Sequence, residues 1–252
     1  KQITNDGKKN STINGTSDWV YEEELGLTKA YSWSPDSRKL AYMKFDESKV
    51  KEMNLSFYGE LYPNEFLYKY PKAGEDNSIV TVWVYDLDNN KTVKADIGTN
   101  TDQYIARIKF TNDNNTLSIF RLNRLQNKLD ILFTDAASGK SKTVFTEGDK
   151  YYLGRSYELT FLKDGSFIRV SDRDGYSHIY LHDKNGDIKN QITKGNFEVS
   201  ELKGVDEEAG TVYYTAFSPD GINKDVFIVN LDGSNKKQLT YKDGFNNATF
   251  SS

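Results

Sequence analysis

Apolar and polar residues alternate along most of this chain in short runs separated by turn-forming residues. One pattern occurs four times, as an alternating apolar run that ends in a turn rich in Asp, Asn or Gly: VWVYDLDNN, LFTDAASG, IYLHDKNG and FIVNLDGS. A period of two is typical of β-strands with one buried face, and the turn residues predict that each strand continues into a hairpin.

These hairpins recur at a nearly constant interval. Their turns begin at Asp86, Asp135, Asp183 and Asn230, which are 49, 48 and 47 residues apart. A second strand-turn-strand pattern precedes each hairpin, as YSWSPDSRKLAYMKF, RIKFTNDNNTLSIFRL, LTFLKDGSFIRVS and LKGVDEEAGTVYYTAF. Joined to the hairpin that follows, it makes a four-stranded antiparallel unit with the period of a β-propeller blade.

The sequence therefore predicts an all-β fold, an incomplete β-propeller of about four four-stranded blades. The blades are expected at about residues 5–95, 96–145, 146–194 and 195–241, with closing strands at Gln2–Thr4, Gln191–Thr193 and Gln238–Thr240. Because the chain starts on a closing strand and stops within an opening one, we expect the blades to belong to a larger, eight-bladed ring. A closed four-bladed propeller is the alternative.

The first blade is roughly 40 residues longer than the others. The surplus lies at about residues 46–78 and contains NLSFYGELYPNEFLYKYPKAGE, which is rich in Tyr, Phe and Leu and is interrupted by Pro63 and Pro71. We expect an inserted arm. An exposed aromatic extension more often marks an interface than a free surface, and the alternative is an arm folded back on its own blade.

Composition narrows the function classes. The chain has 17 Tyr, 14 Phe and 3 Trp, residue types that strands favour, and no Cys, which excludes disulfides, thiolate catalysis and Cys-ligated metals. The net charge is -4 with dispersed basic residues, so no nucleic acid partner is expected. No apolar run approaches the roughly 18 residues that a membrane helix needs, so no membrane span is expected in this chain.

Most catalytic signatures are missing from the sequence. It contains no Gly-X-Ser-X-Gly nucleophile elbow and no Gly-rich phosphate loop. His178 and His182 are the only histidines, and their even spacing places them on one face of a strand, where two metal ligands could start. No third ligand is evident, and histidines on the polar side of a hairpin are commonplace. We therefore expect no metal, no cofactor and no catalytic residue within this chain.

The segment DWVYEEEL, residues 18–25, is the exception to the alternating pattern. Three consecutive glutamates follow a Trp-Val-Tyr cluster, and Asp18 is placed as the N-cap of a short helical turn. Neighbouring residues on a helix point about 100 degrees apart, so Glu23 and Glu24 can both reach one small cation above them. The alternative is a solvated acidic turn, the usual fate of a short charge run.

At this segment the chain resembles the propeller domain of the dipeptidyl peptidase IV family of prolyl oligopeptidase-type serine peptidases. DWVYEEE looks like that family's double-glutamate segment. YPKAG at residues 70–74, DGYSHIY at 174–180 and TKGNFEV at 193–199 follow its later motifs in order, so the similarity spans nearly the whole chain. Repeats of the SPDG type would be weaker support, because TolB-like propellers of unrelated function share them.

The resemblance implies a parent enzyme that releases dipeptides from peptide N-termini, with proline or, less well, alanine as the second residue. It implies that Glu23 and Glu24 hold the α-ammonium group of the substrate. Glu22 and Tyr21 are possible supporting residues. Arg155 is a further possible supporting residue, in a loop, YYLGRSYE, that aligns with a family loop near the site but departs from its pattern at Leu153-Gly154.

The resemblance also implies several parts that this chain lacks, namely the Ser-Asp-His triad, the oxyanion hole and the proline pocket of a C-terminal α/β-hydrolase domain. The implied partners are peptides with a free N-terminus, that hydrolase domain and, through the arm, a second copy in a homodimer. The absence of cysteine and the Asp- and Asn-rich loops point to a bacterial member in the periplasm or at the cell surface. The alternatives are a TolB-like propeller that serves as a non-catalytic protein-binding module, and a structural scaffold without a site.

Overall fold

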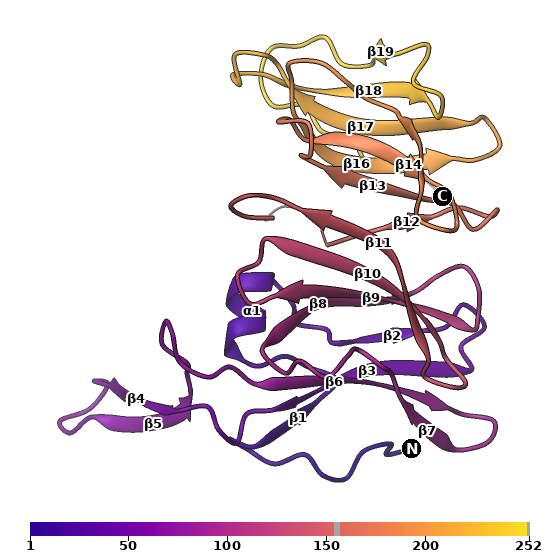
Figure 1. Ribbon diagram of the computed structural model, residues 1–252. Helices are drawn as coiled ribbons and strands as arrows, with labels where there is room; N and C mark the ends of the chain where they lie inside the picture. The colour runs from indigo at the N-terminus through magenta and orange to yellow at the C-terminus, as the bar shows by residue number, and fades with distance from the viewer. Residues whose placement is uncertain (154–156, 251–252) are drawn as a thin grey trace. The chain divides into compact units, whose positions relative to one another are not determined.

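The computed structural model describes residues 1–153 and 157–250 (Figure 1). The chain divides into two compact units, residues 1–153 and 154–252. In the described part of the chain nearly all regular structure is strand, and one short helix, α1 (Trp19–Leu25), lies in the first unit. Within the described residues, no helix is long and apolar enough to cross a bilayer.

The first unit begins with a five-stranded antiparallel sheet. Its strands are β1 (Thr12–Asn14), β2 (Tyr31–Trp33), β3 (Lys39–Asp46), β6 (Ile79–Asp86) and β7 (Lys91–Lys94). The order is β1-β3-β6-β7, and β2 also pairs with β3. Strands β1 and β2 use different halves of the same edge, since β1 pairs with the end of β3 at Lys44–Asp46 and β2 with its start at Leu40–Tyr42. Together they act as one inner strand with an interruption.

The second sheet of this unit is a four-stranded meander. It consists of β8 (Gln103–Phe110), β9 (Thr116–Asn123), β10 (Lys128–Asp135) and β11 (Ser141–Gly148), paired in sequence order. Its inner strand lies against the first sheet, where the Phe110 N–H donates to the Ser32 hydroxyl at 3.1 Å. Large side chains of both sheets, among them Phe45 and Phe120, are fully buried and form the core.

The second unit repeats this arrangement with two more four-stranded meanders. The first contains β12 (Thr160–Phe161), β13 (Phe167–Ser171), β14 (His178–His182) and β15 (Ile188–Gln191), and the second contains β16 (Val199–Asp206), β17 (Thr211–Phe217), β18 (Lys224–Asn230) and β19 (Lys237–Gln238). One apolar cluster, which includes Ile179 and Tyr214, joins the two sheets. The predicted all-β fold, an incomplete propeller of four blades, is confirmed.

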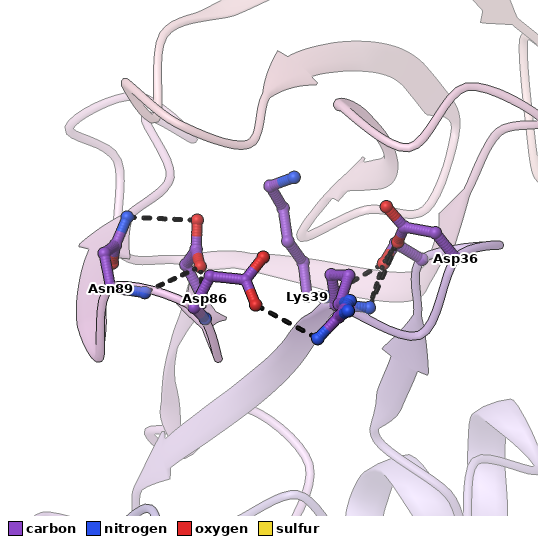
Figure 2. A network of polar contacts seen from close by, with 7 residues as sticks. Asp36, Lys39, Asp86 and Asn89 are labelled. Carbon is purple, nitrogen blue, oxygen red and sulfur yellow. Dashed lines mark hydrogen bonds and ion pairs between the residues drawn. The ribbon is translucent and has the colours of Figure 1, made fainter.

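The repeated turns are held by short-range hydrogen bonds of Asp, Asn and Ser. In the first sheet the Ser34 hydroxyl donates to Asp36 Oδ1 at 2.6 Å, and Arg38 Nη1 lies 3.2 Å from Asp88 Oδ1. Figure 2 shows this network, with the Asn89 side-chain amide donating to Asp86. The hydrogen bond from Ser34 lowers the pKa of Asp36 below its ordinary value. Side chains within the turns thus satisfy part of the turn backbone, and the Asp36 N–H also donates to Asn114 Oδ1 in the β8–β9 turn at 2.9 Å.

Neighbouring sheets within a unit are also joined at a glycine. Gly139, in the β10–β11 turn, has φ +74°, and a Cβ on it would lie 2.2 Å from the carbonyl oxygen of Lys94 at the end of β7. The Asp96 N–H donates to the Gly139 carbonyl at 2.8 Å. Gly233 in the β18–β19 turn approaches Ile192 in the same way in the second unit. The repeat therefore carries its own blade-to-blade contact.

An inserted arm projects from the first sheet as a separate antiparallel hairpin (Figure 1). Its strands are β4 (Glu52–Phe57) and β5 (Asn64–Lys69). Its tip exposes large apolar side chains, including Tyr58, Leu61 and Tyr62, which are 79–91% accessible. The alternative of an arm folded back on its own blade is not what the structure shows.

Three details differ from the sequence-based expectation. Gln2–Thr4 forms no strand. The first sheet has five strands because its inner strand is split. His178 and His182 are buried instead of lying on a polar face, with 1% and 0% of their surface exposed, because β14 is covered on both faces. His178 uses both ring nitrogens, with Thr193 Oγ1 at 3.1 Å and the Gly195 carbonyl at 3.0 Å, so it is a structural residue.

Candidate functional site

The helix α1 lies in the segment that separates β1 from β2, the two halves of the split inner strand of the first sheet. We call this segment, residues 16–29, the excursion. Gly15 leaves the sheet, where its N–H donates to the Met43 carbonyl at 3.0 Å. Ala30 rejoins it, where its carbonyl accepts from the Met43 N–H at 2.9 Å. A single residue of β3 therefore pairs with both ends of the excursion, so the pairing of β3 continues beneath the inserted residues.

Local sequence explains why these residues form a helix that begins and ends where it does. The Asp18 side chain accepts from the Tyr21 N–H at 3.0 Å, which confirms its predicted role as N-cap. Gly26 ends the helix in the left-handed conformation, with φ 58°. Seven residues are too few for a helix that is stable by itself, so its orientation depends on contacts with the rest of the unit.

The underside of α1 is anchored by Tyr21, which is fully buried. Its hydroxyl accepts from the Ile105 N–H of β8 at 3.0 Å, and its ring packs edge-on against Phe45 with centroids 4.9 Å apart. Burial raises the pKa of this hydroxyl well above its ordinary value, so it stays protonated. Tyr21 thus supports the helix from below and does not line the exposed surface.

A second anchor holds the C-terminal end of α1. Arg107 on β8 donates from Nη2 to the Leu25 carbonyl at 2.6 Å. This cation satisfies one of the carbonyls that a helix end leaves without an intrahelical partner, and it lies at the negative end of the helix dipole. The role of Arg107 was not predictable from the sequence, because nothing in the pattern of β8 indicates which helix end this side chain faces.

The first turn of α1 is held by the segment that returns from the arm. The Trp19 and Tyr70 rings lie 4.1 Å apart between centroids, and the Ser78 hydroxyl donates to Asp18 Oδ2 at 2.5 Å. Asp18 is buried, which raises the pKa of its carboxyl despite these hydrogen bonds. The contact was not predicted, but the alternation of Phe66 and Tyr68 in β5 with Tyr70 just after it is a signal that could have indicated it, since alternate residues of an extended segment share one face.

Glu22, Glu23 and Glu24 occupy the exposed side of this anchored helix. Across residues 1–153 and 157–250, no hydrogen bond or ion pair joins their carboxylates to another group. An ionised carboxylate only accepts hydrogen bonds, and three in sequence repel one another. An anchored helix that exposes such groups is suited to bind a cation that can donate several hydrogen bonds.

Within the described residues, no group of three or more His, Asp or Glu side chains is placed to hold a metal ion. His178 and His182 belong to the second unit, and Arg155 falls outside the described residues.

Comparisons with known proteins agree on one family. The model of the dipeptidyl peptidase IV N-terminal region matches residues 1–252. Probable dipeptidyl peptidase 4 of Aspergillus flavus is 30% identical over 84% of this chain and 30% of its own length. Venom dipeptidyl peptidase 4 of Vespa velutina is 29% identical over 94% of this chain and 33% of its own. Inactive dipeptidyl peptidase 10 of Rattus norvegicus is 32% identical over 87% and 30%.

Solved structures give the same result. The crystal structure of Porphyromonas gingivalis dipeptidyl peptidase 4 matches all of this chain and 36% of its own with a TM-score of 0.94 and 39% identity. A putative dipeptidyl aminopeptidase IV from Bacteroides ovatus matches 94% of this chain and 36% of its own with a TM-score of 0.83 and 28% identity. The chain therefore spans about a third of the length of these relatives.

Proposed function

This chain belongs to the family of the dipeptidyl peptidase IV N-terminal region, and on that premise we propose that it recognises the free N-terminus of a peptide substrate through Glu23 and Glu24. The observation that carries the proposal is the exposed pair of carboxylates on a helix anchored at both ends. An α-ammonium group carries three N–H donors and a full positive charge, and charge-assisted hydrogen bonds to two carboxylates are strong and directional.

The proposal extends to the whole protein of which this chain is a part. The parent is a serine-type peptidase that releases X-Pro or X-Ala dipeptides, and its catalytic triad lies in a C-terminal hydrolase domain outside this chain. The propeller portion controls access of peptides to the active site. The distance from the ammonium site to the catalytic nucleophile accommodates two substrate residues, which sets the length of the released product. Membership alone does not decide activity, because one relative of similar identity is named an inactive dipeptidyl peptidase.

Assembly and location are also proposals. The exposed apolar tip of the arm supports a homodimer, which sedimentation of the parent would test. The bacterial solved structures support a bacterial source, with the protein in the periplasm or at the cell surface, which cell fractionation would test.

The decisive experiment replaces one carboxylate at a time in the parent enzyme. Glu23→Gln and Glu24→Gln keep the shape and remove one charge that faces the ammonium group. Truncating one side of a desolvated charge pair typically costs about 2–5 kcal/mol, so kcat/KM for an Ala-Pro-X peptide should fall by roughly 30-fold to several thousand-fold. Part of the loss should appear in kcat, because the anchor also orients the scissile bond.

Glu22→Gln is the matched control, since it makes the same charge change on the same helix, and its effect should be far smaller. Acetylating the N-terminus of the peptide should reproduce the effect of the two variants in the wild-type enzyme. Wild-type rates in Glu23→Gln and Glu24→Gln, or an acetylated peptide cleaved as fast as the free one, would refute the proposed role. A parent without peptidase activity would favour the alternative of a protein-binding propeller.

A further inference from the structure

The arm and the glutamate helix are joined by a row of aromatic rings. Phe66 and Tyr68 on β5 stack with centroids 5.8 Å apart, and Tyr68 meets Tyr70 edge-on at 5.9 Å. Tyr70 then contacts Trp19 of α1 at 4.1 Å, the shortest separation in the row. The last ring of the arm thus packs against the first residue of the helix.

Polar contacts join the same two segments independently of the rings. The Ser78 hydroxyl donates to the N-cap carboxylate of Asp18. The Asn77 amide donates to the Tyr104 hydroxyl at 2.7 Å, and the Tyr104 ring lies 5.9 Å from Tyr21 beneath the helix. Residues 70–78, the return segment of the arm, therefore contact the first turn of α1 directly and reach its underside through the Tyr104 ring beside Tyr21.

The return segment is itself fixed to the second sheet. Arg124, in the β9–β10 turn, donates from Nη2 to the Glu75 carbonyl at 3.0 Å. The ring of Tyr70 is therefore part of a braced segment, and it is only partly exposed. A braced ring in contact with a seven-residue helix constrains how that helix is rotated and tilted.

We infer that Tyr70 is a positioning residue for the ammonium site, acting through Trp19 on the orientation of Glu23 and Glu24. This inference rests on the proposed function. Without the Tyr70 ring, α1 keeps Asp18, Tyr21 and Arg107 as anchors but loses the side-on contact at its first residue. A displacement of about 1 Å at a recognition site can cost 100-fold in rate, so a modest rotation of a short helix is enough to weaken recognition.

The test measures selectivity for the α-amino group in the parent enzyme. The two substrates are an Ala-Pro-X peptide and its analogue that lacks the α-amino group, and the readout is the ratio of their kcat/KM values. Tyr70→Ala should lower this ratio roughly 10- to 100-fold, mainly through the free-amine substrate. Tyr70→Phe keeps the ring and should restore the wild-type ratio. Tyr241→Ala, an 82% exposed tyrosine in the second unit, is the matched control and should leave the ratio unchanged.

Thermal unfolding and sedimentation of each variant separate positioning from general damage. If Tyr70→Ala slowed both substrates equally, or if Tyr70→Phe failed to restore the ratio, the inference would be overturned. A lowered ratio in Tyr241→Ala would also overturn it, because that tyrosine lies outside the arm and the row of rings. Glu23→Gln tests the premise separately: if it collapses the ratio while Tyr70→Ala does not, the recognition site stands and only the positioning role fails.

Discussion

Replacing Gly139 by alanine should destabilise the first unit far more than the same change at a glycine with open surroundings. Gly74 is the matched control, because its φ of +82° is close to the +74° of Gly139 but no atom lies within 4 Å of the position its Cβ would take. Forcing a left-handed conformation on alanine costs about 1–2 kcal/mol at either site. Only at Gly139 would the new Cβ also collide with the backbone, because it would lie 2.2 Å from the Lys94 carbonyl oxygen.

The extra cost at Gly139 can be worked out from its contacts. Overpacking a tight site costs about 1–3 kcal/mol, and moving the turn away breaks the 2.8 Å hydrogen bond from the Asp96 N–H, worth about 1 kcal/mol. Gly139→Ala should therefore lose about 2–4 kcal/mol more than Gly74→Ala. With a urea m-value of about 2–3 kcal/mol/M, the unfolding midpoint should fall by roughly 1 M relative to the control.

Tryptophan fluorescence is a suitable assay for this comparison. All three tryptophans, Trp19, Trp33 and Trp83, lie within residues 1–153, so their emission reports unfolding of the first unit alone. Equal midpoints for Gly139→Ala and Gly74→Ala would show that the contact between the two sheets contributes nothing to stability, and the reasoning would be wrong.

Two further predictions concern buried carboxylates, each measured by urea unfolding as a function of pH. Asp18→Ala removes the N-cap and leaves the Ser78 hydroxyl without its acceptor, so it should cost about 2–4 kcal/mol, and Asp18→Asn should cost less. Because burial raises the pKa of Asp18 in the folded state, the wild type should gain stability relative to Asp18→Asn as pH falls through that raised pKa, and an opposite trend would contradict the burial argument. Asp130 is the reverse case. Burial acts to raise the pKa of its carboxyl, but hydrogen bonds from Arg121, at 2.8 Å, and from Thr146 outweigh the effect of burial, so the pKa lies below its ordinary value of 3.8. The advantage of the wild type over Asp130→Asn should be complete above pH 3.8 and shrink as pH falls below it, and a constant difference down to the lowest pH would argue against the pair.

Much of the fold was predictable because its information is local and repeated. The turns at Asp86, Asp135, Asp183 and Asn230 carry their own hydrogen-bonding side chains, so each turn can be recognised from its local sequence. The nearly constant spacing of these turns then indicated the blades. The N-cap role of Asp18 was predictable for the same reason, since the Tyr21 N–H that donates to its side chain lies only three residues ahead in the sequence. Gln2–Thr4 was misassigned because the matching QIT segment elsewhere suggested a strand, whereas pairing depends on a neighbour that a short motif does not specify.

The anchors of the site were not predictable, because they connect residues that are distant in sequence. Tyr21 meets Ile105 and Arg107 meets Leu25 across 82–84 positions, and neither pair leaves a trace in a periodic pattern. The burial of His178 was missed because β14 is covered on both faces, so alternation gave no indication of which side faces solvent. The residues proposed to bind were thus easier to select from the sequence than the residues that hold them in place.

The double use of Met43 has a consequence for how this protein family can change over evolutionary time. Since one residue of β3 pairs with Gly15 and with Ala30, the excursion between them adds chain without shifting strand register on either side. Substitutions confined to the exposed residues 22–24 leave the ladder of β3 with the same partners and the buried side of the helix unchanged. Selection can therefore change the exposed side of the helix while the blade beneath it is inherited intact, so a new chemistry on that surface need not require a new scaffold.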